Sequence, residues 1–305
     1  MEETQEGPLV VQHTPLSVAI AAVRAMRPHQ WTKNSLLFAA LIFSGEFLHI
    51  ESIIETLIGF TAFSALASSG YIFNDYLDRE ADRRHPRKRK RPIASGALPP
   101  WAAVIEMLVL VIAGAVTAYS LSPAFLAIAL LYLGTTLSYS FFLKHVVIID
   151  VMFLASGFVW RAIGGAVAIE VEVSPWLFLC TAFLALFLGF EKRKGELRMV
   201  GDGANTRKIL DEYTSQMLLQ FQSIVTTSAL LSYALYSVLG PTPWMALTVP
   251  YVLYGIFRYV YLVERHGEGA APDETLLRDR PIQVTVVLYG LTAMGILYAM
   301  KAGLI

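Results

Sequence analysis

The stretch GYIFNDYLDREADRRHPRKRKRPIASG, from Gly70 to Gly96, joins a long apolar segment to a dense run of charge. It holds four acidic and eight basic residues, and most of the bases follow the acids. Asp75, Asp78 and Asp82 are spaced i, i+3 and i+7, which on a helix places the three carboxylates on one face within about two turns. Three like charges this close repel one another unless a positive group lies between them.

A hard divalent cation would meet this need. Carboxylate oxygens are the ligands that Mg²⁺ prefers, and Mg²⁺ keeps waters or substrate phosphates in the rest of its shell. The predicted ligands are Asn74, Asp75, Asp78 and Asp82. The alternative is a solvated helix end, whose acids would pair with Arg79, Arg83 and Arg84. We favour the metal site, because an apolar helix that runs directly into a one-sided acidic stripe is an unusual way to make a surface.

The composition around this stretch is that of a membrane protein. Of the 305 residues 55% are hydrophobic and 16% are charged, whereas a soluble domain carries about 25% charge. A spanning helix needs roughly 20 mostly apolar residues, and backbone groups in lipid must be satisfied within the segment. We therefore expect an all-α polytopic membrane protein with nine transmembrane helices. They are predicted at Asn34–His49, Ile53–Asn74, Trp101–Leu121, Pro123–Leu143, Ile148–Ile169, Trp176–Phe190, Leu219–Leu239, Trp244–Val263 and Pro281–Met300.

Other features exclude several classes of protein. The formal net charge of +0 argues against a nucleic-acid partner, and the single cysteine, Cys180, excludes an internal disulfide and a Cys-based metal cluster. The start MEETQEGPLVVQHTP lacks the basic residues of a signal peptide. We expect residues 1–23 to form a short cytoplasmic tail and residues 24–305 a single transmembrane catalytic domain.

The distribution of Lys and Arg predicts the orientation. With nine spans and a cytoplasmic N-terminus, the basic residues between Arg79 and Arg91, Lys144 and the EKRKGELR loop with Arg207 all lie on the cytoplasmic side. The opposite side keeps Lys301. We therefore predict a multi-pass protein of the cell membrane whose polar site faces the cytoplasm.

The segment NDYLDREAD fits the NDxxDxxxD pattern of the UbiA superfamily of intramembrane prenyltransferases, and the following HPRKRKRPIASG resembles that family's continuation. The predicted nine spans agree with the family. The resemblance implies a UbiA-like helical bundle in which the motif carboxylates hold Mg²⁺ against a diphosphate. It assigns the catalytic role to Asp75, Asp78 and Asp82.

Three further stretches resemble one subgroup, the decaprenyl-phosphate phosphoribosyltransferases: RPHQWTKNSLLFAALIFSG, DVMFLASGFVWRAIGGAVA and LALFLGFEKRKGEL. This resemblance implies transfer of 5-phosphoribose from phosphoribosyl diphosphate to a polyprenyl phosphate lipid, with release of diphosphate, in the synthesis of a cell-wall arabinan precursor. Members that use prenyl diphosphates carry a second motif, DxxxD, where this chain has FEKRKGEL. A homo-oligomer is left open.

The predicted substrate-binding residues stand mostly at the cytoplasmic ends of the spans. They are Lys33, Asn34, Asn74, Lys88, Arg91, Tyr139, Lys144, Asp150, Arg161, Lys192, Arg193 and Glu196. Each has a plainer alternative. The basic cluster sets topology and contacts anionic lipid headgroups, and Lys33 extends to the interface. Lys192 and Glu196 form an i, i+4 surface pair, and Asp150 and Arg161 brace neighbouring helices.

Two other functions remain open at this point. A UbiA-type enzyme that moves a prenyl group to an aromatic acceptor should need the absent DxxxD motif. A transporter or lipid-binding protein should place polar groups near the bilayer midplane, in broken spans. Arg161 and Arg258 keep that second alternative open, although most of the charge is concentrated at one end of the spans.

Overall fold

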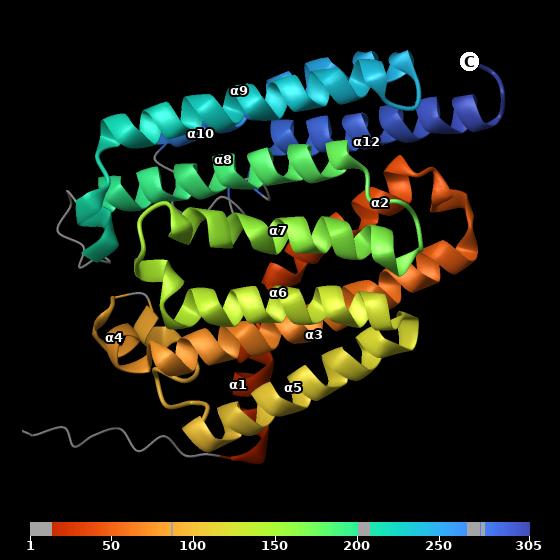
Figure 1. Cartoon of the computed structure of the whole chain (residues 1–305). Helices are drawn as coiled ribbons and strands as arrows, with labels where there is room; N and C mark the ends of the chain where they lie inside the picture. Colours follow the sequence, from red (N-terminus) through yellow and green to blue (C-terminus); the bar gives the residue numbers. More distant parts are fainter. Residues whose placement is uncertain (1–13, 87, 201–207, 267–274, 276–277) are drawn as a thin grey trace, which may run out of the picture.

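The computed structural model describes residues 14–86, 88–200, 208–266, 275 and 278–305. These residues form helices and connections without a strand, so the all-α prediction is confirmed for them. Figure 1 shows the long helices lying side by side. Their bounds are α3 Ile50–Leu77, α5 Pro100–Leu121, α6 Pro123–Phe141, α7 Ile149–Ala168, α8 Pro175–Val200, α9 Ser215–Leu239, α10 Val249–His266 and α12 Arg280–Lys301. The shorter helices are α1 Pro15–Ala25, α2 Phe38–Phe43 and α4 Arg79–Arg84, and the 3₁₀ segments are η1 Pro28–Leu37, η2 Glu46–Leu48, η3 Lys88–Lys90, η4 Leu143–His145, η5 Lys208–Glu212 and η6 Pro243–Thr248.

Within the described ranges, eight helices are long and apolar enough to cross a membrane. They coincide with the second to ninth predicted spans. Large apolar side chains lie on their outer faces: on α5, Trp101 is 67% exposed and Val116 is 65% exposed. Burying such faces in hydrocarbon removes the cost of exposing them to water. The chain is therefore a multi-pass membrane protein.

The first predicted span differs from our expectation. Residues 34–49 do not form one helix but continue the 3₁₀ segment η1, then form α2, a turn and η2. Gly45 ends α2 with φ 74°, a left-handed conformation that glycine adopts at little cost. The apolar run from Leu36 to Phe43 lies between the polar stretch PHQWTKN and the polar residues Ser44 to Glu46, so it is too short to cross a membrane as one helix.

The 3₁₀ segment η1 is held inside the bundle between α3 and α7. A Cβ atom on Gly165 of α7 would lie 2.1 Å from the carbonyl oxygen of Leu37, so the two backbones touch there. Next to this contact, the Asn34 amide donates to Ser64 Oγ on α3 at 2.9 Å. Arg161 Nε on α7 donates to Asn34 Oδ1 at 2.6 Å. The polar side chain of Asn34 in this 3₁₀ segment is thus hydrogen-bonded to buried side chains of both neighbouring helices, as a polar group inside a membrane protein requires.

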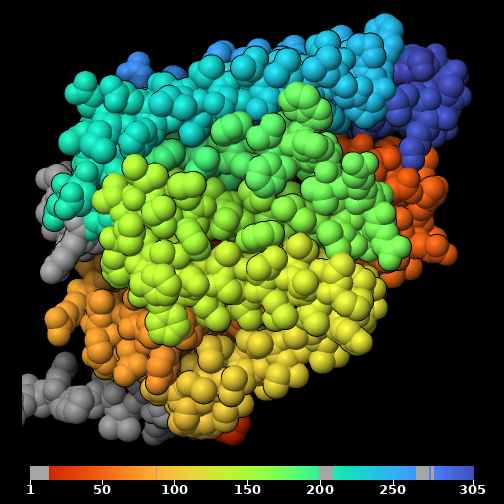
Figure 2. Space-filling model, viewed as in Figure 1, coloured from red at the N-terminus to blue at the C-terminus, as the bar shows by residue number. Residues whose placement is uncertain are grey.

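The helices follow one another around the bundle in nearly the order of the chain. α3 contacts α5 and α6, and α6, α7, α8 and α9 then pack in sequence. Figure 2 shows these helices as adjacent bands on one face of the molecule. The last helix, α12, packs on α10 and reaches α2, where Lys301 Nζ donates to the Gly45 carbonyl and to Glu46 Oε1, both at 3.1 Å. The Lys301 ammonium lowers the pKa of the Glu46 carboxyl.

The helix α1 begins inside the tail that we predict over residues 1–23. Thr14 caps it, because its hydroxyl accepts from the Ser17 N–H at 3.2 Å, and Pro15 takes the first helical position. Ala21 and Ala25 are buried with residues of α3 and α5. The predicted division between residues 23 and 24 falls within α1, and residues 1–13 lie outside the described part of the chain.

We expect Gly165→Ala to lower the free energy of unfolding by about 1–3 kcal/mol or more, because the new methyl group would force η1 away from α7. The matched control is Gly134→Ala on α6, where a Cβ meets nothing within 4 Å. That change should be neutral or stabilising by up to about 1 kcal/mol. Thermal unfolding in detergent measures both, and equal midpoints for the two variants would contradict this packing.

Candidate active site

One end of the bundle, on the left in Figure 1, gathers most of the residues that the sequence singles out. The C-terminal end of α3 and all of α4 lie there, together with the connection between α6 and α7 and the C-terminal half of α8. Most of the candidate acids and bases belong to these segments. The expectation of a charged region at one end of the spans therefore agrees with the architecture.

Asp75 lies in the last turn of α3 and is only 3% exposed. Both of its carboxylate oxygens accept from Arg27 Nη2, at 2.6 and 2.7 Å. Arg91 Nη1 donates to Asp75 at 3.0 Å and to Asp82 at 2.7 Å. Asp82, on α4, is equally buried. One guanidinium thus bridges the first and third aspartates of the motif, and a second one holds the first.

Asp78 occupies the joint between the two helices, since α3 ends at Leu77 and α4 begins at Arg79. The backbone bonds continue across this joint from Asp78 N–H to the Asn74 carbonyl, at 3.0 Å. The Asp78 side chain accepts from Lys144 Nζ at 2.7 Å and from the Asn74 amide at 3.2 Å. Lys144, on η4, is buried although it is cationic. Each of the three motif aspartates therefore has its own contact with a cation.

The chemistry of these side chains fits Mg²⁺. Asn74 and the three aspartates all lie near the end of α3, and each can offer an oxygen atom as a ligand. Their present arrangement is built around cationic side chains. Within the described ranges, no three His, Cys, Asp or Glu side chains are grouped closely enough to hold a metal ion. A divalent ion would therefore take over contacts that Arg27, Arg91 and Lys144 now make.

Arg27 contacts the aspartate motif, although our sequence analysis does not name it among the candidate site residues. Its backbone has φ 53°, a conformation uncommon for a residue with a side chain and often found at functional sites. Its guanidinium also lies 5.3 Å from the centre of the Tyr71 ring. The sequence signal was present but weak: Arg27 directly precedes Pro28 at the start of the first segment that resembles the subgroup.

A second charged group lies where α7 begins and α8 ends. Arg193 is fully buried and its Nε donates to Asp150 Oδ2 at 2.6 Å. Its other nitrogens donate to Glu196 and, at 3.2 Å, to the Tyr139 hydroxyl. Asp150 also accepts from the Tyr213 hydroxyl at 2.7 Å. Four predicted residues are thus brought together, and Tyr213 is one that the sequence did not single out.

The three other predicted lysines lie on α8, η1 and η3. Lys192, next to Arg193 on α8, lies close enough to Glu196 and Lys33 to interact with their charges. Lys33 is half-buried on η1. Lys88 begins η3, and its backbone N–H donates to His85 Nδ1 at 3.3 Å.

Arg161 and Asp150 of α7 have different partners, since Asp150 pairs with Arg193 and Arg161 contacts residues of other segments. Besides Asn34, Arg161 donates to the Tyr132 hydroxyl at 2.9 Å and to the Gly157 carbonyl at 2.8 Å. The guanidinium also lies 4.7 Å from the centre of the Tyr132 ring. Arg161 and Asn34 therefore connect helices, which is the bracing alternative that the sequence left open.

Arg258, which is only partly buried, is the other cation within a span that kept the transporter alternative open. Its guanidinium pairs with Asp279 at 2.9 Å, between α10 and the start of α12. The hydrogen bond from Arg258 lowers the pKa of the Asp279 carboxyl. Asp279 also caps α12 by accepting from the Ile282 N–H at 2.9 Å.

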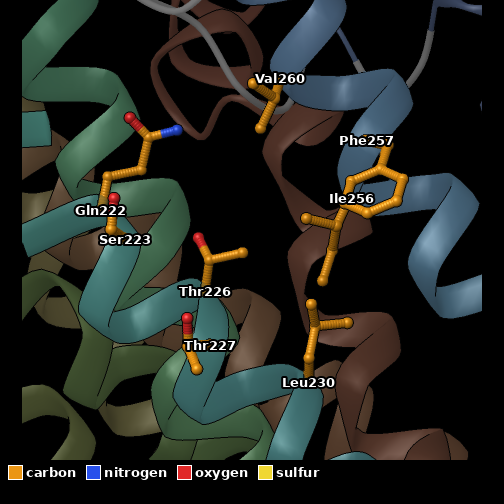
Figure 3. A pocket seen from close by; sticks show the side chains of 8 residues that line it. All are labelled: Gln222, Ser223, Thr226, Thr227, Leu230, Ile256, Phe257 and Val260. Atoms are coloured by element: carbon orange, nitrogen blue, oxygen red, sulfur yellow. The ribbon is translucent and has the colours of Figure 1, made fainter.

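A groove of about 420 Å³ lies elsewhere, between α9 and α10. Figure 3 shows Gln222, Ser223 and Thr226 on its α9 wall, opposite the apolar side chains of α10. Gln222 accepts from Lys194 Nζ at 3.0 Å, so Lys194 points to α9 while its neighbour Arg193 points to α7. None of the predicted site residues lines this groove, and we assign no chemistry to it.

Comparison with known proteins agrees with the fold and the motif. The profile of the UbiA prenyltransferase family matches residues 35–275. The chain is 34% identical over 288 residues to decaprenyl-phosphate phosphoribosyltransferase of Mycobacterium tuberculosis, covering 92% of this chain and 95% of that protein. It is 35% identical over 298 residues to the enzyme of that name from Corynebacterium glutamicum, covering 94% and 89%.

Among solved structures, a UbiA homologue from Archaeoglobus fulgidus bound to GPP and Mg²⁺ superimposes with a TM-score of 0.71. The two chains share 15% sequence identity, and the match covers 91% of this chain and 99% of that one. This likeness shows the fold. The chain belongs to the UbiA prenyltransferase family. The predictions of a UbiA-like bundle and of a membrane-embedded transferase are therefore confirmed.

We expect Arg91→Gln to lower the free energy of unfolding by about 3 kcal/mol, because it leaves the buried Asp75 and Asp82 facing each other without their shared cation. The control is Glu80→Gln, which breaks an exposed pair with Arg83 on the same short helix and should cost less than about 0.5 kcal/mol. Unfolding in detergent measures both. Equal losses would mean that the Arg91 bridge contributes no more than a surface pair.

Proposed function

We propose that this protein transfers 5-phosphoribose from phosphoribosyl diphosphate to a polyprenyl phosphate, of the decaprenyl class, with the help of Mg²⁺. The names of the most similar relatives support this proposal, since they cover nearly the whole chain. The observation that carries it is the pairing at the end of α3. Three carboxylates, each matched by a cationic side chain, provide ligands for a divalent ion and for phosphates at the same place.

The substrates of this reaction need many cations. The donor carries a 5-phosphate and a diphosphate, and the acceptor carries a phosphate of its own. Guanidinium and ammonium groups bind such anions directly, and guanidinium does so with two parallel hydrogen bonds. We assign the donor phosphates to Arg27, Lys88, Arg91, Lys192 and Arg193. Lys33 and Lys144 steer the lipid phosphate.

The residues that would hold Mg²⁺ are Asn74, Asp75, Asp78 and Asp82. When bound, the ion neutralises charge on the diphosphate as it departs. Arg27 and Arg91 then turn from the carboxylates to the phosphate oxygens, so that the number of paired charges is conserved. This exchange suits a donor that arrives with Mg²⁺, because its phosphates bring negative charge and the ion brings positive charge.

The reaction breaks the bond between C1 of ribose and the diphosphate oxygen. An oxygen of the polyprenyl phosphate forms the new bond to C1 from the opposite face, so a single displacement inverts the configuration. Positive charge develops on the ribose ring as the old bond lengthens, as in other glycosyl transfers. The acceptor phosphate is already ionised at neutral pH, so no strong general base is required.

The end of α8 favours this reaction over transfer of a prenyl group to an aromatic acceptor. The family members that use prenyl diphosphates carry DxxxD there, whereas this chain has Lys192, the buried Arg193 and Glu196. A neutral aromatic acceptor has no use for additional cations beside the diphosphate. A phosphorylated sugar and a phosphorylated lipid both do.

We also propose that the N-terminus and this site face the cytoplasm, in the inner or plasma membrane. The basic residues of η3, η4 and the end of α8 gather at the site's end of the bundle, while Lys301 lies at the other end. This asymmetry is the one that orients membrane proteins. A soluble, charged donor would then reach the site directly from the cytoplasm.

The test is to incubate the purified protein with phosphoribosyl diphosphate and polyprenyl phosphate, with and without Mg²⁺. Mass spectrometry should detect lipid-linked phosphoribose in the Mg²⁺ sample and not in the sample with chelator. Asp78→Ala should lower turnover by at least about a hundredfold, because it removes a proposed ligand of the ion. A prenylated aromatic product, formed from prenyl diphosphate instead, would overturn the proposal.

Glu51→Gln provides the matched control for Asp78→Ala. Glu51 lies on the same helix, α3, but in its first turn at the opposite end, and it is exposed. The turnover of the Glu51→Gln variant should equal that of the unchanged protein. Glu51→Gln should keep the thermal midpoint of the unchanged protein in detergent. Asp78→Ala should unfold at a lower temperature, because Lys144 loses its partner, but still in one cooperative transition, which separates loss of chemistry from loss of fold.

A further inference from the structure

Tyr213 belongs to the connection between α8 and α9, outside the membrane-spanning helices. The residue follows η5 and precedes Thr214, which caps α9. Tyr213 is nevertheless only 3% exposed, and its ring packs with Val151 of α7 and Leu218 of α9 in one apolar cluster. Burial raises the pKa of its hydroxyl, and the hydrogen bond to Asp150 adds to the rise, so the group stays protonated.

The hydroxyl of Tyr213 makes two short hydrogen bonds at the start of α7. It accepts from the backbone N–H of Ile148 at 2.7 Å and donates to Asp150 Oδ1 at 2.7 Å. Ile148 has φ 68°, a conformation that is strained for a β-branched residue. The Tyr213 hydroxyl therefore provides a hydrogen-bond acceptor for the backbone N–H of Ile148. This residue forms an irregular turn just before α7.

Asp150 connects the Tyr213 hydroxyl to Arg193, because it accepts a hydrogen bond from each of them. Asp150 has no exposed surface and uses its second oxygen, Oδ2, to accept from Arg193 Nε at 2.6 Å. The hydroxyl therefore limits the rotation of the carboxylate, and the carboxylate limits the rotation of the guanidinium. The remaining Arg193 nitrogens point to Tyr139 and Glu196, on the side of the bundle where Lys192 and Lys33 lie.

We propose that Tyr213 is a positioning residue, which holds Arg193 through Asp150 in the orientation that binds a phosphate group of the donor. This rests on the proposed function only in the identity of that donor. Removing the hydroxyl would leave a buried backbone N–H and a buried carboxylate each short of a partner. Arg193 could then adopt other rotamers, and the site would bind anions less tightly without losing a group that contacts them.

The experiment compares Tyr213→Phe with Tyr233→Phe. Tyr233 is a matched control, since it is buried and its hydroxyl bonds to Thr248 at 2.6 Å and Tyr289 at 3.2 Å, in a different apolar cluster. Tyr213→Phe should raise the KM for phosphoribosyl diphosphate about tenfold and leave kcat within about twofold, since it weakens ground-state and transition-state binding alike. Tyr233→Phe should change neither. An unchanged KM in Tyr213→Phe overturns the proposal.

A double-mutant cycle tests whether the effect passes through Arg193. In an Arg193→Lys background, adding Tyr213→Phe should raise KM no further, because the planar group that it positions is gone. A further tenfold rise would overturn the positioning role. Asp150→Asn, which keeps the volume of the side chain, is the second variant if Tyr213→Phe does not fold. It should raise KM as well, and an unchanged KM would overturn the proposal.

Direct binding separates this proposal from the proposed function. If the unchanged protein forms no lipid-linked phosphoribose, the proposed function fails, and inorganic diphosphate is titrated by calorimetry into the same purified proteins. Tyr213→Phe should then bind diphosphate about tenfold more weakly than Tyr233→Phe does. Equal affinities for the two variants would overturn the positioning role, whatever reaction the enzyme catalyses.

Discussion

The site depends on the neutralisation of carboxylates at the end of α3, where they are withdrawn from water. A charge in such a place is costly unless an opposite charge with good hydrogen bonds accompanies it. Asp75 and Asp82 meet this condition through Arg27 and Arg91, and Asp78 meets it through Lys144. These cations come from three different connections, so electrostatics gathers three distant parts of the chain around one helix end. The same groups can separate when a substrate offers each of them a new partner.

The crossing segment η1 links that end to the interior of the bundle. Its backbone touches Gly165, and its Asn34 side chain joins Arg161 on α7 to Ser64 on α3. These contacts fix α7 relative to α3. Since α7 begins with Asp150, the brace also sets the distance between the aspartate motif and the buried Arg193. The buried Arg161 in α7 therefore marks a structural contact, although buried charges in spans more often mark a substrate pathway.

The sequence was most informative where one physical requirement dominates. Apolar length predicted eight of the spans, and the aspartate spacing predicted where the charged end lies. It failed for residues 34–49, because hydropathy does not reveal that Gly165 lets a 3₁₀ segment pass between helices. It missed Arg27 and Tyr213, whose roles depend on contacts with residues far away in the chain. The sequence did not reveal the partners of Asp150 and Arg161, since helical periodicity gives the direction of a side chain but not its partner.

The closing contact between α12 and the segment around Gly45 has a consequence for the synthesis of the protein. The segment around Gly45 is completed by α12, whose Lys301 lies 256 residues later in the chain. Until α12 has been synthesised, α2 lacks this neighbour, and the translocation machinery, a chaperone or lipid must cover it. Assembly of this part of the bundle therefore waits for α12, and a chain that stops before this helix would expose the uncovered side of α2 to the proteases of the membrane.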